Sequence, residues 1–79
     1  MNAPTQRQRE ILRLIAERID EGLPPTVREL GDALGISSTN GVADHLAALV
    51  RKGLLERRHN RARAMRLTTY GLQTIGRVA

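Results

Sequence analysis

Apolar residues recur at helical spacing in three segments of the chain, each preceded by a residue suited to cap a helix. The stripe of the first segment consists of Ile11, Leu12, Ile15 and Ile19. This period predicts an amphipathic helix of about four turns. Thr5 and Gln8, before the stripe, have the spacing of a capping box, whereas Gly22, Pro24 and Pro25, after it, are typical of a helix end.

The second and third segments repeat this logic over shorter distances. Thr26 and Glu29 form another capping-box pair, and Gly35 is free to adopt the left-handed conformation in which many helices end. Ser37 or Ser38 is then expected to cap the third helix. The apolar positions are Leu30, Ala33 and Leu34 in the second segment, and Val42, Leu46, Leu49 and Val50 in the third. A short helix, a turn and a longer helix form a helix-turn-helix motif, predicted over about residues 27–47.

The pattern changes after residue 53. The sequences LLERR and AMRLTT, separated by HNRAR, predict two short strands of a β-hairpin, in whose loop Asn60 is suited to a positive φ angle. Three helices followed by a hairpin predict a mainly α fold with a small two-stranded wing, the winged helix-turn-helix. We assign residues 1–68 to this domain and 54–68 to its wing. Residues 69–79 have weak periodicity, and we interpret them as a linker.

The N-terminal turn of the third predicted helix is Ser-Ser-Thr-Asn-Gly, an unusual start for a helix that only needs to pack. In a helix-turn-helix motif, the first turns of the second helix meet base edges in the major groove. Asn pairs with adenine, Ser and Thr reach several bases, Asp accepts from cytosine, and Gly41 would allow a close backbone approach. In the alternative, Ser38 merely caps the helix and Asn40 is solvated. Because this leaves the glycine unexplained, we favour base readout.

The net charge of +5 is concentrated in the predicted wing. The arginines of the segment ERRHNRARAMR are Arg57, Arg58, Arg61, Arg63 and Arg66. Charged side chains also protect exposed strand edges from aggregation, which is the alternative explanation. However, like charges this close repel one another unless an anion relieves them, so we expect the wing to contact DNA phosphates.

The composition argues against several other functions. Tyr70 is the only aromatic residue, which disfavours base stacking on single-stranded nucleic acid, and no cysteine is present for a disulfide or a thiolate metal site. The two histidines lack the spacing of a metal ligand set, and no serine has a neighbouring base, so we expect no metal, no cofactor and no enzymatic activity. No apolar run has the length of a membrane span or the form of a signal peptide, so we expect no membrane contact and a cytoplasmic location.

The segment PPTVRELGDALGISSTNGVADHLAALVRKGLLERR resembles the N-terminal DNA-binding domain of the LexA repressors of the bacterial DNA-damage (SOS) response. The similarity covers about residues 4–68, from TQRQREIL through the double proline and HLAALVRKG to the arginine-bearing wing. It implies a dimeric transcriptional repressor that binds palindromic operators, with the third helix in the major groove and the wing near the backbone. The best-known members carry an acidic pair where this chain has Ala43 and Asp44, so one potential acceptor for cytosine is missing.

The resemblance, together with the residue chemistry above, implies two sets of contacts with double-stranded DNA. The bases are expected to face Ser38, Thr39, Asn40, Gly41, Ala43 and Asp44. The backbone phosphates are expected to face Arg28, Arg51, Lys52, Arg58, Arg61 and Arg63. Two such domains on neighbouring half-sites would block a promoter.

The final segment GLQTIGRVA resembles the part of LexA that runs into an Ala-Gly bond which that protein cuts in itself. We therefore interpret residues 69–79 as a linker toward an absent C-terminal peptidase and dimerisation domain with a Ser-Lys dyad, and expect the homodimer on DNA to be weak without it. In the family, RecA filaments stimulate this cleavage.

The sequence leaves two alternative functions open. A stand-alone repressor, encoded by a phage, would also fit a chain of this length. A winged-helix protein-interaction module is the alternative from another class. Its binding face would need an apolar or aromatic anchor, which the Ser-Asn-Gly turn does not offer.

Overall fold

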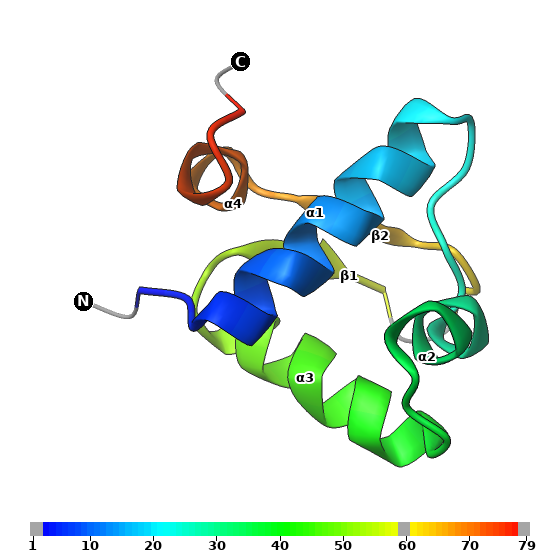
Figure 1. The fold of residues 1–79 in the computed structure, drawn as a ribbon. Helices are drawn as coiled ribbons and strands as arrows, with labels where there is room; N and C mark the ends of the chain where they lie inside the picture. The colour runs from blue at the N-terminus through cyan, green and yellow to red at the C-terminus, as the bar shows by residue number, and fades with distance from the viewer. Residues whose placement is uncertain (1–2, 59–60, 78–79) are drawn as a thin grey trace.

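The computed structural model describes residues 3–58 and 61–77, and it combines helices with one antiparallel hairpin (Figure 1). The elements are α1 (Gln6–Asp20), α2 (Val27–Leu34), α3 (Thr39–Arg51), β1 (Leu55–Arg57), β2 (Met65–Leu67) and α4 (Thr69–Thr74). The predicted order of three helices followed by a two-stranded wing is therefore confirmed. An additional short helix follows the wing.

Helix α1 forms as its capping signal predicts. Thr5 Oγ1 accepts a hydrogen bond from Gln8 N at 3.1 Å, and Gln8 Oε1 accepts one from Thr5 N at 2.9 Å. The buried stripe of α1 lies at the centre of an aliphatic core. The core residues are Ile11, Leu12, Ile15, Ala16, Leu30, Val42, Leu46, Leu49, Leu54, Leu55, Met65 and Leu67.

Helices α2 and α3 meet at a tight turn over residues 35–38. Thr26 and Glu29 form the second predicted capping box, and Gly35 ends α2 with a φ of 73°. Buried Gly31 permits the close approach of the turn: a Cβ there would lie 3.0 Å from the carbonyl oxygen of Ile36 and 3.3 Å from a methyl group of Val42. The sequence interpretation did not identify this role of Gly31, which allows Ile36 of the turn and Val42 of α3 to pack closely against α2.

The hairpin pairs Leu55 with Leu67, Glu56 with Arg66 and Arg57 with Met65. Because side chains alternate along a strand, the leucines and Met65 turn inward, where β1 packs against α3 and β2 against α1, while Glu56 and Arg66 face solvent. In the loop, Arg63 has a positive φ of 64°. The predicted turn residue Asn60 lies outside the described residues.

Residues 69–74 form helix α4, which the linker interpretation did not anticipate. Thr68 caps the helix, since its Oγ1 accepts from Gly71 N at 3.0 Å, and α4 packs against α1 and β2. The two glycines that weaken the sequence signal include Gly71, which contacts the backbone of Leu54 too closely for any side chain. In Figure 1, α4 lies on the opposite side of α1 from α2.

Two positions of the predicted apolar stripes are wrong. Val50 is 40% exposed, because it lies about 80° around the helix from Val42, at the edge of the buried face. Ala33 is exposed, because α3 packs against the side of α2 that carries Leu30 and Gly31.

Within the described ranges 3–58 and 61–77, no helix has the length and hydropathy needed to cross a membrane.

Candidate nucleic-acid interface

The N-terminal end of α3 presents small polar side chains to solvent. Ser38 is the N-cap, and its Oγ accepts from Gly41 N at 3.3 Å. Thr39 and Asn40 follow in the first turn, and both are exposed. Ser38 therefore has the capping role that the alternative interpretation gave it, whereas Thr39 and Asn40 are available to a ligand.

The outer face of α3 continues from Asn40 along the helix. At 100° per residue, this face is opposite to the buried Val42, Leu46 and Leu49. Its members are Asn40, Ala43, Asp44, Ala47 and Arg51. The sequence interpretation missed Ala47, although the same helical period would have identified it. Small side chains between Asn40 and Arg51 would let the helix backbone lie deep in a groove.

Gly41 has a structural reason to lack a side chain. A Cβ at this position would lie 3.3 Å from Cγ2 of Ile36 and 3.9 Å from Cβ of Ser38. The bare position thus faces the turn of the motif as well as the start of α3. A direct role of Gly41 in DNA contact stays a prediction.

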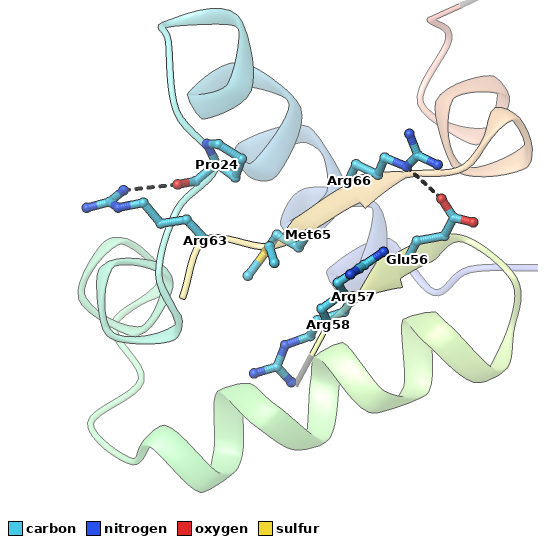
Figure 2. Close-up of a pocket in the computed structure, with 8 residues that line it drawn as sticks. Pro24, Glu56, Arg57, Arg58, Arg63, Met65 and Arg66 are labelled. Atoms are coloured by element: carbon cyan, nitrogen blue, oxygen red, sulfur yellow. Dashed lines mark hydrogen bonds and ion pairs between the residues drawn. The ribbon is translucent and has the colours of Figure 1, made fainter. Parts of the chain in front are cut away.

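The wing arginines differ in their surroundings. Arg66 Nε lies 2.7 Å from Glu56 Oε1 on the solvent face of the hairpin, so their charges offset one another (Figure 2). Arg58 and Arg61 are exposed, whereas Arg57 is half-buried. For these three arginines, no carboxylate of the described residues lies within ion-pair distance.

A groove joins the start of α2, the start of α3 and the wing. It is lined by Thr26, Val27, Arg28, Thr39, Arg57, Arg61, Ala62, Arg63 and Met65. Thr39, the first residue of α3, therefore shares one concave surface with Arg28, Arg57 and Arg61. We call this surface the wing groove. Arg57 was predicted only as one of the wing arginines and not as an individual contact residue, although strand alternation from Leu55 would have turned it toward this side.

Two of the predicted phosphate contacts have internal partners. Lys52 Nζ donates to Gln8 Oε1 at 2.7 Å and to the carbonyl oxygen of Ala3 at 3.2 Å, which joins the end of α3 to the N-terminal segment. Arg63 forms a two-pronged ion pair with Glu29. The Arg63 hydrogen bonds lower the pKa of the Glu29 carboxyl, and the hydrogen bond from the backbone of Thr26 lowers it further. For Lys52 and Arg63, these contacts argue for structural roles.

Within residues 3–58 and 61–77, no three His, Cys, Asp or Glu side chains gather closely enough to hold a metal ion. The arrangement is instead that of a cationic surface beside a polar helix end. Such a surface can attract phosphate by charge and offer hydrogen bonds to base edges.

Sequences similar to this chain occur in LexA repressors. The chain is 53% identical over 77 residues to the LexA repressor of Anaeromyxobacter sp. (strain Fw109-5), a match covering 96% of this chain and 33% of that protein. It is 49% identical over 71 residues to the LexA repressor of Enterococcus faecalis (strain ATCC 700802 / V583), covering 89% and 34% of the two proteins. For the LexA repressor of Mycobacterium ulcerans (strain Agy99), identity is 52% over 64 residues, covering 80% and 26%.

The chain thus spans about a third of the length of these relatives, or less. Residues 1–64, which are most of the chain, match the family described as the LexA DNA binding domain. The chain belongs to the LexA DNA-binding domain family.

Proposed function

We propose that this chain binds double-stranded DNA sequence-specifically, as the N-terminal domain of a LexA-type transcriptional repressor. The N-terminal end of α3 enters the major groove, where Asn40 and Asp44 read base edges. Arg28, Arg57 and Arg61 of the wing groove contact backbone phosphates. In this assignment the chain itself is not an enzyme, and it acts in the bacterial cytoplasm, where its operator DNA lies.

One observation carries the proposal: the polar end of α3 opens directly onto the wing groove. Thr39 lines this groove together with Arg28, Arg57 and Arg61, and the three arginines have no carboxylate partner among the described residues. A phosphate strand along the groove would neutralise them while Asn40 faces the adjacent bases. If each arginine contacts one phosphate, they contribute roughly three units to the salt dependence of binding.

The exposed apolar side chains argue against the protein-interaction alternative. Among the described residues, the large apolar side chains that face solvent are Leu23, 62% exposed, and Val50, 40% exposed. Leu23 lies in the connection between α1 and α2, Val50 lies near the end of α3, and neither is aromatic. A protein-binding face usually centres on clustered aromatic or aliphatic anchors, which these two residues do not form.

Mapping the DNA contact by NMR tests the proposal. Addition of duplex DNA should shift the backbone amides of Thr39, Asn40, Asp44 and the wing groove, and leave those of α4 in place. The same titration with an unrelated acidic polymer separates general charge attraction from groove entry, because it should shift the wing but not Asn40. Shifts centred on α4 or around Leu23 would refute the proposed face.

We further propose that the domain acts in pairs. The relatives are about three times as long as this chain, and they are named as repressors. A C-terminal half that dimerises would raise the affinity of two domains for a palindromic operator through effective concentration. In a protein of that length, RecA-stimulated self-cleavage would separate the DNA-binding domain from the dimerising part and end repression of the SOS genes.

The affinity of the single domain, compared with that of two domains joined by an artificial dimerisation segment, tests the pairing. The joined form should bind the operator at least about 100-fold more tightly. Equal affinities would contradict it.

A further inference from the structure

One arginine of the wing is tied to α2 by both terminal nitrogens of its guanidinium group. Arg63 Nη2 lies 2.8 Å from Glu29 Oε2, and Arg63 Nη1 lies 3.0 Å from both Glu29 Oε1 and the carbonyl oxygen of Pro24. Figure 2 shows the Arg63 side chain extending from the hairpin loop toward Pro24. A fork of this kind fixes orientation as well as distance. It therefore joins the wing to the first turn of α2.

The backbone of Arg63 indicates that the direction of its side chain matters. With a φ of 64°, the residue occupies the left-handed region, which is unfavourable for a residue with a Cβ atom. A loop that needed only a turn would carry glycine or asparagine there. Strained residues of this type persist where the surrounding contacts hold them, and they cluster at functional sites.

The two strands of the wing are held in place by the core, since β1 packs against α3 and β2 against α1. The loop between them needs contacts of its own, because each strand is only three residues long. The loop is closed by Arg58 N donating to Ala64 O at 2.9 Å, and by two longer bonds of 3.4 Å that involve Arg61. These bonds shape the loop but do not reach α2. Within the described residues, the hydrogen bonds between the wing and α2 are those of Arg63 with Glu29.

We propose that Arg63 is a positioning residue for DNA binding: its ion pair with Glu29 holds the wing loop, and with it Arg61, on the wing groove beside Arg57 and Thr39. This inference rests on the proposed function and deepens it. Neither member of the pair needs to contact DNA. If Arg63 instead contacted a phosphate, Glu29 would only repel the DNA, and neutralising Glu29 would strengthen binding. If Arg63 positions the wing loop, neutralising Glu29 would weaken binding.

Glu29→Gln separates these roles. The glutamine keeps the helix cap, because Gln8 already fills the same place in the capping box of α1. It removes a negative charge near the DNA and frees Arg63, so electrostatics alone predicts tighter binding. Loss of the positioning contact predicts weaker binding by about two- to fivefold, with an unchanged slope of log affinity against log salt.

Two further variants complete the experiment, which uses duplexes selected for binding to the wild-type domain. Arg63→Lys keeps the charge but loses the fork, so it should weaken binding as Glu29→Gln does. Glu56→Gln is the matched control: Glu56 pairs with Arg66 on the solvent face of the same hairpin, and its neutralisation should leave affinity unchanged or slightly raised. Tighter binding by Glu29→Gln, or wild-type affinity for Arg63→Lys, would overturn the proposal.

Amide hydrogen exchange of the free domain provides a readout that does not depend on DNA. Glu29→Gln should accelerate exchange of the Ala64 amide, which bonds within the wing loop, and leave the amide of Leu46 in the core protected. Unchanged exchange at Ala64 would overturn the proposal. A wild-type domain without any preference among duplexes would instead refute the proposed function, and the exchange measurement would still decide whether Arg63 holds the wing.

Discussion

Replacement of Gly71 by alanine tests how helix α4 is attached to the domain. An alanine Cβ at this position would lie 2.1 Å from the carbonyl oxygen of Leu54, whereas real Cβ atoms essentially never approach closer than 3.0 Å. The backbone on one side must therefore move by about 1 Å, into a packed region that resists small displacements. The same carbonyl accepts a hydrogen bond from Thr68 N at 3.2 Å, so the movement also disturbs the residue that caps α4.

The magnitude follows from three contributions. Overpacking of this kind costs about 1–3 kcal/mol, and the disturbed hydrogen bond costs about 1 kcal/mol more. The better helix propensity of alanine returns about 1 kcal/mol. The net loss of roughly 1–3 kcal/mol is a large fraction of the roughly 4–12 kcal/mol of unfolding free energy expected for a domain of this size.

Thermal unfolding followed by circular dichroism measures this loss. A change of 1 kcal/mol shifts the Tm of a domain of this length by about 4–8 °C, so Gly71→Ala should lower it by roughly 5–20 °C. Gln73→Ala is the control, because Gln73 is an exposed residue of the same helix and its loss should change stability by less than about 0.5 kcal/mol. A Tm for Gly71→Ala equal to or above that of the wild type would refute the close contact between α4 and Leu54.

Three other changes probe the charged contacts. Arg61→Ala should weaken binding to all duplexes alike and flatten the salt slope by about one unit in a fluorescence-anisotropy titration; an unchanged slope would return Arg61 to the role of a solvated surface charge. Lys52→Ala should lower the unfolding free energy by about 1 kcal/mol in urea denaturation, because it removes the bond to Gln8, and should leave the salt slope unchanged. Because its Arg63 partner lowers the pKa of Glu29, the carboxylate stabilises the fold at neutral pH and loses this effect as pH falls through the lowered pKa. The stability difference between wild type and Glu29→Gln should thus shrink as the pH is lowered from about 7 to about 3, and a constant difference would contradict this.

Local rules predicted the helix ends well because they depend on few residues. Both capping boxes lie within four consecutive positions, and a glycine such as Gly35 needs only its own φ angle to end a helix. The order of three helices and a wing followed from these ends and from the apolar periods between them. The exposed polar start of α3 was predicted in the same way.

Features that depend on contacts between distant residues could not be predicted from the sequence. Helix α4 is only six residues long, contains Gly71 and is stable only because it docks on α1 and β2, with Gly71 against Leu54. The pairing of Arg63 with Glu29 joins residues 34 positions apart, so the arginine count of the wing overestimated the charge available to DNA. The position of Arg57 on the wing groove beside Thr39 likewise depends on the packing of β1 against α3.

Selection of bound duplexes from a randomised pool, at two salt concentrations, tests the central claim that the N-terminal end of α3 reads a DNA sequence. The wild-type domain should enrich a common half-site, arranged as a palindrome, at both concentrations. Asn40→Ala should lose that enrichment at a cost of roughly 1–3 kcal/mol on the selected site, while its binding to random DNA is retained. Binding without any enriched sequence, and abolished by the higher salt concentration, would contradict the claim and leave only a basic wing on phosphates.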